Sequence, residues 1–239
     1  MSRLPRSLQL GTTGRIYQDL FQQIVHGTLV PNTLLSESEL AKQMESSRTP
    51  VREALLMLEG DGLLRRYPGR GYLVTEVTLQ DVDEIFELRI GLERLALKKA
   101  YPNLSNSLLL KLEAQLEELG AQSTPDEFYS ADRTLHKLLA HYCGNSRLQK
   151  FLNTLDSQIE RVRYISARRP DRLPESKREH LDIIHALKQH NLDLAEEKLV
   201  KHIQNVGEST KQVCRLQQSR SPFPTVSASE TEKGGWTSG

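Results

Sequence analysis

Four side chains in the second half of the chain have the types and the spacing of a metal site. Asp132 and His136 lie four residues apart in a segment with a helical pattern, so both are expected on one helical face. His180 and His202 lie on later segments that are also predicted to be helical. One carboxylate and three imidazoles that converge inside a bundle would form an N₃O site for a divalent metal, and zinc, nickel and manganese all suit such ligands.

The same residues allow other interpretations. A single histidine on a helix is usually a packed or surface residue, and Asp132 with His136 could be an ordinary helical ion pair. A hydrolytic metal centre with an open water position is a further possibility. No obvious general base accompanies the four residues, so we expect a protein that is not an enzyme.

A second chemically distinctive group is basic and lies near the N-terminus. Arg48 and Arg52 are four residues apart and share a face of a predicted short helix. A guanidinium group can bind O6 and N7 of guanine together in the major groove of DNA. Arg66 and Arg70 fall in a predicted hairpin, where they suit phosphates or a minor groove. The alternative is that these arginines are solvated surface charges.

The elements that must position these arginines follow the order of a winged helix-turn-helix. The pattern predicts a helix over residues 12–26, a second over 37–44 that begins with a capping box of Ser36 and Glu39, and a third that Ser47 caps. Two short β-like runs then flank the turn at residues 68–71, which indicates a hairpin. We therefore expect a DNA-binding domain over residues 11–75, after an N-terminal arm of residues 1–10.

From residue 78 onward the sequence predicts only helices, and a domain over residues 78–217. The predicted helices span 79–101, 105–121, 125–142, 146–168, 174–190 and 192–217. Residues 218–239 are rich in Ser, Thr, Pro and Gly and lose this periodicity, so we expect a disordered tail. The predicted fold class is mainly α, a winged helix-turn-helix followed by an all-α helical bundle.

Composition restricts the setting but does not identify the partner. The chain has 239 residues and a net charge of +1, which argues neither for nor against nucleic acid. The cysteines, Cys143 and Cys214, form no CxxC pair, and no segment has the length and apolarity of a signal peptide or a membrane helix. We expect a cytoplasmic protein with no membrane partner.

The N-terminal motifs resemble the GntR family of bacterial regulators. The similarity is carried by SRTPVREAL at residues 47–55, LSESELA at 35–41 and GRGYLV at 69–74. It implies a homodimer on a palindromic double-stranded DNA operator. The predicted DNA-binding residues are Ser36, Ser47, Arg48, Thr49, Arg52, Arg66, Gly69 and Arg70. Ser38 departs from relatives that carry a DNA-contacting Arg there, and Asn32 replaces the usual turn Gly, a change that Asn tolerates because it can adopt positive φ.

The C-terminal motifs resemble the FCD-type effector domain of the FadR-like branch, in its smaller VanR-like form. The similarity is carried by Asp132-x₃-His136, by CGN at residues 143–145, by Glu179-His180 and by His202. It implies a small organic acid bound beside the metal that Asp132, His136, His180 and His202 hold.

A carboxylate clamp for that acid is predicted on the first helix of this domain. Arg89 lies in FELRIGLE at residues 86–93, a run that matches the family's first effector helix, and it could point inward as a bidentate ligand-binding group. The alternative is an intrahelical pair with Glu93. Arg161 and Arg163 are weaker candidates.

These motifs together predict a ligand-responsive regulator of transcription that acts as a repressor. The first effector helix, around Leu88, Leu92 and Leu95, is the predicted dimer interface. The alternative function is a constitutive DNA-binding protein with a purely structural metal.

Overall fold

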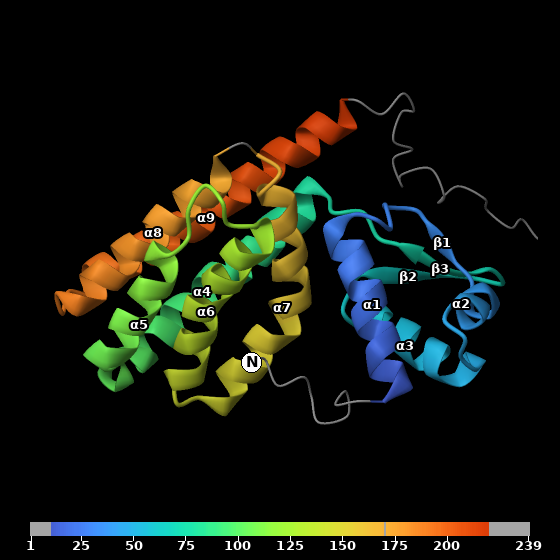
Figure 1. The fold of residues 1–239 in the computed structure, drawn as a ribbon, viewed down its shortest axis with the longest axis horizontal. Helices are drawn as coiled ribbons and strands as arrows, with labels where there is room; N and C mark the ends of the chain where they lie inside the picture. Colours follow the sequence, from blue (N-terminus) through green and yellow to red (C-terminus); the bar gives the residue numbers. More distant parts are fainter. Residues whose placement is uncertain (1–10, 170, 220–239) are drawn as a thin grey trace, which may run out of the picture.

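The computed structural model describes residues 11–169 and 171–219 (Figure 1). The described part is mainly helical, which confirms the predicted fold class, with a three-stranded sheet near the N-terminus. The helices are α1 (Thr12–His26), α2 (Glu37–Gln43), α3 (Arg48–Gly60), α4 (Leu79–Ala100), α5 (Asn106–Glu117), α6 (Pro125–Tyr142), α7 (Ser146–Ser166), α8 (Arg172–Lys188) and α9 (Leu192–Gln218), with a 3₁₀ turn at Tyr101–Asn103. The strands are β1 (Leu34–Leu35), β2 (Leu64–Tyr67) and β3 (Gly71–Val74).

The N-terminal elements α1 to β3 enclose a core of their own. Leu20 of α1 packs with Val51 and Leu55 of α3, and all three side chains are almost fully buried. The sheet is antiparallel with strand order β1-β3-β2, so the predicted hairpin of β2 and β3 is confirmed. Strand β1 was not predicted from the sequence because two residues are too few to show an alternating pattern.

The predicted capping of α2 and α3 is wrong, although both helix starts are at the expected residues. Ser36 and Ser47 occupy the N-cap positions with extended backbones, but neither side chain makes a capping hydrogen bond. The Ser36 hydroxyl instead lies 2.9 Å from the hydroxyl of Ser38. A serine can bond to a nearby hydroxyl as readily as to a helix amide, and this local competition is not visible in the sequence pattern.

Two turn positions explain how the wing closes on β1. Asn32 has φ 65°, the left-handed conformation that the sequence analysis expected Asn to tolerate. Gly71 begins β3 with φ 122°, and a Cβ atom there would collide with the carbonyl oxygen of Leu35. Only glycine lets the two strands approach this closely at that point.

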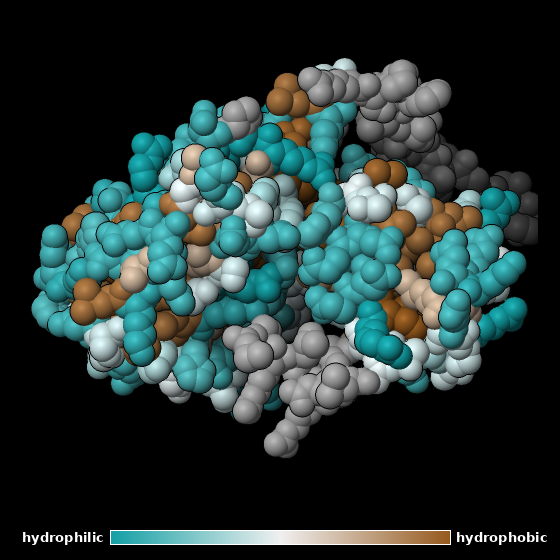
Figure 2. Space-filling view, viewed as in Figure 1, coloured by the Kyte–Doolittle hydropathy of each residue, from teal (hydrophilic) through white to brown (hydrophobic). Residues whose placement is uncertain are grey.

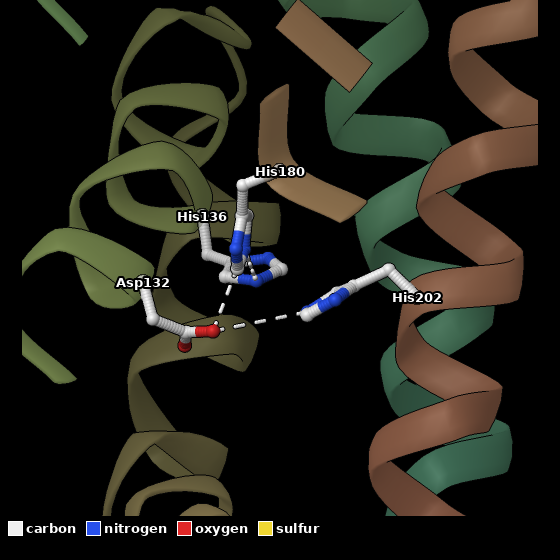
Figure 3. Close-up of side chains that lie close together, drawn as sticks. All are labelled: Asp132, His136, His180 and His202. Atoms are coloured by element: carbon white, nitrogen blue, oxygen red, sulfur yellow. Dashed lines mark hydrogen bonds and ion pairs between the residues drawn. The ribbon is translucent and has the colours of Figure 1, made fainter. Parts of the chain in front are cut away.

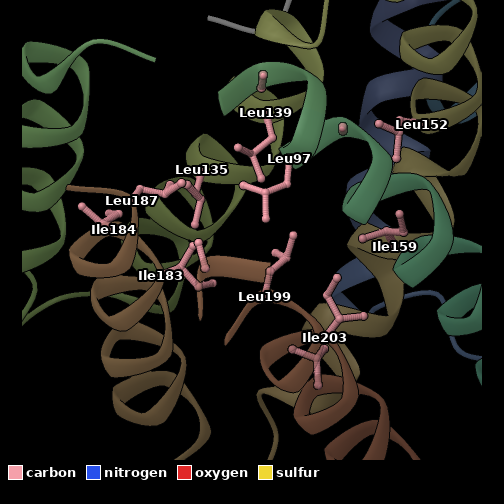
Figure 4. Close-up of a cluster of buried hydrophobic side chains, with 14 of the residues drawn as sticks. Leu97, Leu135, Leu139, Leu152, Ile159, Ile183, Ile184, Leu187, Leu199 and Ile203 are labelled. Atoms are coloured by element: carbon pink, nitrogen blue, oxygen red, sulfur yellow. The ribbon is translucent and has the colours of Figure 1, made fainter. Parts of the chain in front are cut away.

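The helices α4 to α9 form the larger bundle, whose core lies between α4, α6, α8 and α9. Leu97, Leu135, Ile183 and Leu199 are fully buried there (Figure 4). Helix α5 ends at Glu117, before the predicted residue 121, and α8 begins at Arg172, before the predicted 174. Helices α4 and α6 begin with capping boxes, at Thr78 with Asp81 and at Thr124 with Glu127, which the sequence analysis did not single out.

Helix α7 belongs to the bundle but also contacts the N-terminal elements, and it lies beside α1 (Figure 1). Gln158 donates a hydrogen bond to the carbonyl oxygen of Asp61 at 3.2 Å, and Arg161 donates to Oγ1 of Thr75 at 2.8 Å. Arg161 also bonds to the carbonyl oxygen of Thr75. These contacts place one face of α7 against the end of α3 and the segment that leaves the wing.

Two predictions concern residues at the chain ends. The N-terminal arm, residues 1–10, lies outside the described residues, and so does the predicted tail except for Gln218, which ends α9, and Ser219.

The face seen in Figure 2 is mostly hydrophilic with scattered apolar patches. No helix in the described ranges is long and apolar enough to cross a membrane.

Candidate metal centre and DNA interface

The structure brings the four predicted metal ligands together inside the helical bundle. Asp132 and His136 come from consecutive turns of α6, His180 from α8 and His202 from α9 (Figure 3). One ligand atom from each residue lies within 4.8 Å of all the others. All four side chains are buried, His202 completely. The α6 pair faces the cluster together, so the helical ion pair considered above is not formed.

The distances between the ligand atoms are suitable for a single ion. His180 Nε2 lies 3.3 Å from His136 Nε2 and 3.5 Å from Asp132 Oδ1, and His202 Nε2 lies 3.9 Å from the same carboxylate oxygen. Two ligands that each bond to one ion at about 2.0–2.2 Å are separated by about 3–4 Å. These three spacings fall in that range, and no pair of ligand atoms is more than 4.8 Å apart, so an ion such as zinc would require the widest pairs to close by less than about 1 Å.

The outer ring nitrogens of the histidines are held by acceptors, which directs the Nε2 atoms toward the cluster. His180 Nδ1 donates to the carbonyl oxygen of Ser176 at 2.8 Å, and His202 Nδ1 donates to Glu179 Oε2 at 2.7 Å. Nδ1 of His136 bonds to Glu93. An Nδ1–H donor leaves the Nε2 lone pair free, which is the arrangement that metal-binding histidines usually have.

Two atoms of the cluster have no hydrogen-bond partner in spite of complete burial, His202 Nε2 and Asp132 Oδ2. Arg163 Nε lies 2.9 Å from Asp132 Oδ2, but this contact is an ion pair without hydrogen-bond geometry, because neither atom is satisfied. Buried polar atoms without partners are rare in folded proteins, and a bound ion or water is a common partner for them. The residues present therefore fit a divalent metal.

His136 is the predicted ligand whose Nε2 atom contacts a charged donor. Arg89 Nη2 lies 3.0 Å from this atom, and Arg89 Nε donates to Glu93 Oε1 at 2.7 Å. Arg89 is completely buried, and its Nη1 has no partner. The predicted inward orientation and the alternative pair with Glu93 are thus both present. His136 can coordinate an ion only when Arg89 gives up its hydrogen bond.

Electrostatic effects hold the acids of this site ionised and its histidines neutral. Burial raises the pKa of Asp132, but Arg163 and the three histidines outweigh it and hold this pKa well below the usual range. Burial lowers the pKa of His136 to about 4 and also lowers the pKa values of His180 and His202. Neutral imidazole is the form that binds metal.

The charges around the cluster balance without an ion. The carboxylates of Asp132, Glu93 and Glu179 are matched by the guanidinium groups of Arg163, Arg89 and Arg172, and Arg172 holds Glu179 with two hydrogen bonds of 3.0 and 2.6 Å. A divalent ion would add two positive charges to this neutral set. An anion beside it would then be electrostatically favoured.

A small cavity adjoins the Asp132 and His180 side of the cluster. Its polar wall includes Arg163 and Ser166, whose side chains are buried and each carry an atom without a partner. Its wall also includes Leu116, Leu119, Phe128, Tyr129, Ala167, Arg172, Leu173, Ser176, Lys177 and Val206. Arg89 is not among the described residues that line it. The weaker sequence candidate, Arg163, therefore has the more direct access to this space.

The predicted DNA-binding residues lie on the exposed side of α3 and on the wing. Helix α3 buries Val51 and Leu55 and exposes Arg48 and Arg52, as the four-residue spacing requires. Ser47 and Thr49 are exposed on the same first turn. A concave surface brings the start of α2, the start of α3 and the wing together, and its residues include Ser36, Ser38, Arg48, Arg66, Gly69 and Arg70.

Two tyrosines that the sequence analysis did not single out support the wing arginines. The Arg70 guanidinium carbon lies 5.7 Å from the ring centre of Tyr67, and that of Arg66 lies 5.6 Å from the ring centre of Tyr72. Arg66 also lies 3.6 Å from Glu59. The exposed arginines are therefore partly oriented before any partner binds.

Comparison with known families decides what these two sites belong to. Residues 12–74 match the model of the bacterial regulatory proteins of the gntR family, and residues 84–205 match that of the FCD domain. The chain belongs to the GntR family. It is a DNA-binding transcriptional regulator with an FCD domain, and not an enzyme, as the sequence predicted.

Curated relatives of this GntR-family chain match along most of its length. YdhC of Bacillus subtilis (strain 168), an HTH-type transcriptional regulator, is 32% identical over 205 residues, which cover 83% of this chain and 91% of YdhC. The transcriptional repressor RspR of Escherichia coli (strain K12) is 30% identical over 202 residues, which cover 83% of this chain and 89% of RspR.

Solved structures show the same fold. McbR (YncC) of E. coli has a TM-score of 0.70 at 25% identity, and the match covers 85% of this GntR-family chain and 99% of McbR. The Zn²⁺-bound FCD domain of the regulator TM0439 has a TM-score of 0.53 at 24% identity over 59% of this chain and 99% of that domain. At this identity the second likeness shows the fold alone.

Several groups that support the metal site were missed from the sequence. Glu179 precedes His180 and appeared only as part of a motif, and Ser176 lies one turn before His180 without any distinguishing pattern. Glu93 was considered only as a partner of Arg89. Their roles depend on how four helices meet, which spacing along one helix does not reveal.

The burial of three neutral histidines predicts an acid sensitivity of the metal-free protein. Folded-state pKa values below the unfolded value of about 6.5 mean that unfolding takes up protons, so stability present above pH 6.5 is lost as the pH falls toward 4. Each histidine lowers the free energy of unfolding by up to about 1.4 kcal/mol for each pH unit of acidification in this range. Urea denaturation in EDTA between pH 7 and pH 5 measures this. His180→Gln should lower the slope, and equal stability at both pH values would contradict the prediction.

Proposed function

We propose that this protein is a ligand-responsive regulator that binds palindromic operators as a homodimer and whose DNA affinity depends on a small organic acid beside a metal ion. The observation that carries the proposal is the buried cluster of Asp132, His136, His180 and His202, in which Asp132 Oδ2 and His202 Nε2 have no hydrogen-bond partner. The similarity to RspR, whose name describes a repressor, supports repression as the mode of action.

DNA would be read by α3 and held by the wing. Arg48 and Arg52 project from the exposed face of α3, and a helix of this size fits the major groove. Ser47, Thr49 and Ser36 lie at the helix starts, where hydroxyl groups and backbone amides suit phosphate oxygens. Arg66, Gly69 and Arg70 form the exposed wing beside them and suit the backbone or the minor groove.

A second copy of the chain would cover the exposed apolar positions of α4 and α7. Leu88 and Leu95 are 54% and 43% exposed, and Leu92 is half-buried between them. Phe151 on the adjacent helix α7 is 63% exposed. Large apolar side chains exposed on neighbouring helices suit an isologous contact, and a dimer places two reading helices on two half-sites.

The metal would be held by the four cluster residues, with zinc, nickel or manganese all compatible with three imidazoles and a carboxylate. Its chemistry would be that of a Lewis acid that attracts an anion. Arg89, once it releases His136, would offer Nη1 and Nη2 to a carboxylate, and Arg163 and Ser166 would offer donors from the cavity side. That TM0439 binds Zn²⁺ in its FCD domain supports zinc as the first ion to test.

The DNA interface predicts which substitutions change specificity. The operator for these tests is a duplex selected from a random library by its binding to the protein. Light scattering of the complex should give two chains per duplex, as a homodimer requires. Arg48→Ala and Arg52→Ala should each weaken binding to it by about 1–3 kcal/mol and reduce discrimination. Arg70→Ala should weaken binding to selected and random duplexes alike, and it should reduce the salt dependence of binding. Gel-shift competition measures both effects, with Arg147→Ala on α7 as control. Full discrimination by Arg52→Ala would exclude this placement of α3.

The metal centre predicts the effect of removing one ligand. His180→Ala should lose Zn²⁺ binding in isothermal titration and lose the rise in Tm that Zn²⁺ gives the wild type, because only three ligands remain. His141→Ala removes an exposed histidine of α6 and should leave Zn²⁺ binding unchanged. Equal Zn²⁺ affinity of His180→Ala and wild type would remove His180 from the site.

The proposed role of Arg89 as a carboxylate clamp predicts a separate effect on the binding of anions. A thermal-shift screen of small carboxylates on the Zn²⁺-loaded protein identifies an acid that stabilises it. Arg89→Ala should still bind Zn²⁺ but bind that acid about tenfold or more weakly, because a charged hydrogen bond is lost. Unchanged affinity in titration calorimetry would remove Arg89 from the ligand site. DNA binding that no stabilising acid alters would favour the alternative, a constitutive DNA-binding protein with a structural metal.

A further inference from the structure

Three aromatic rings form a continuous stack across the boundary between the two domains. The Tyr164 ring of α7 contacts the Tyr129 ring of α6, with ring centres 3.8 Å apart and planes tilted by 34°. It also contacts the His26 ring at the end of α1, with ring centres 4.6 Å and planes 28° apart. The Tyr164 hydroxyl donates to Asp126 Oδ1 at 2.9 Å, which fixes the ring against the first turn of α6. The stack therefore connects three helices from the two domains.

Tyr164 joins a different hydrophobic core from most apolar residues of α7. Helix α7 contributes Leu148, Leu152, Ile159 and Val162 to the core of the bundle. Tyr164, by contrast, packs against the core of the DNA-binding domain. A displacement of this ring would be felt directly by α1, since α1 supplies Leu20, Ile24 and Val25 to that core and His26 to the stack.

The other end of the stack reaches the cavity that adjoins the metal cluster. Tyr129 is part of the cavity wall together with Asp132 and His180. It lies three residues before Asp132 on α6, so the two side chains share a helical face. Any adjustment of α6 that brings Asp132 toward an ion, or any molecule that fills the cavity, must also act on the Tyr129 ring.

We infer that Tyr164 transmits the state of the metal and effector site to the DNA-binding domain through Tyr129 and His26. This inference rests on the proposed metal site and adds its means of communication. Tyr164 acts as a positioning residue, because it touches neither the cluster nor the concave DNA surface. A ligand can change DNA affinity only if it favours one arrangement of the two domains, and this stack is a packed path by which it would do so.

Two hydrogen-bonded contacts between the domains lack this connection. Arg161 bonds to Thr75 and Gln158 bonds to Asp61, and neither donor is part of the cavity wall. Both donors line a separate cleft between α4, α7 and the segment 75–77 that joins the wing to α4. These two contacts would hold the domains together with or without bound metal and effector. The aromatic stack, by contrast, has one end in the wall of the cavity beside the metal cluster.

Hydrogen–deuterium exchange of α1 in the full-length protein tests the inference, with Zn²⁺ as the only added ligand and EDTA as the reference. In the wild type, Zn²⁺ should change exchange of the α1 amides by about fivefold or more. Tyr164→Ala and His26→Ala should bind Zn²⁺ with unchanged affinity in titration calorimetry and lose this change. His26 is exposed, so its variant tests the stack without disturbing a core.

Two further variants separate coupling from general damage. Tyr164→Phe keeps the ring stack, loses only the bond to Asp126, and should retain the response. Tyr142→Ala removes a tyrosine at the far end of α6, where its ring contacts His141, and should also retain it. An α1 response of wild-type size in His26→Ala and Tyr164→Ala, or no response in wild type that binds Zn²⁺, overturns the inference and leaves the metal site standing. Failure of wild type to bind Zn²⁺ overturns both.

Discussion

A carboxylate buried among three neutral imidazoles is the constraint on which the helical domain depends. Asp132 cannot remain ionised inside a bundle without compensation, and Arg163 supplies it at 2.9 Å without the geometry of a hydrogen bond. The outer nitrogens of the histidines are already satisfied by Ser176, Glu179 and Glu93. Of the inner nitrogens, that of His136 contacts Arg89 and His180, and that of His202 has no partner. The interior is built as a polar site whose four potential ligand atoms fit a divalent cation.

This arrangement also explains why the rest of the domain is organised around α6 and α7. Helix α6 carries two of the predicted metal ligands on the face that also carries Tyr129. Helix α7 carries Arg163 toward the cluster and Tyr164 toward the DNA-binding domain. Helix α7 therefore contacts both the candidate metal centre and the DNA-binding domain. The rings of Tyr129 and Tyr164 lead from the wall of the cavity beside the cluster to His26 at the end of α1.

Much of this could be predicted from the sequence, and the limits have physical causes. Hydrophobic periodicity and turn residues located the helices and the hairpin, and the spacing of Asp132 and His136 placed both on one face. The capping by Ser36 failed because a neighbouring hydroxyl competes for it. Arg163, Glu179 and Tyr164 were missed or ranked low because their roles arise where separate helices meet, and no periodicity along one helix encodes that meeting.

The central claim is that Asp132, His136, His180 and His202 together hold one divalent ion in the full-length protein. X-ray absorption spectroscopy of the Zn²⁺-loaded chain tests it most directly, because it reports ligand types and distances without reference to DNA or effector. The account predicts one zinc per chain with three imidazole nitrogens and at least one oxygen at about 2.0–2.2 Å. A spectrum with sulfur ligands, or with one imidazole or none, would contradict it.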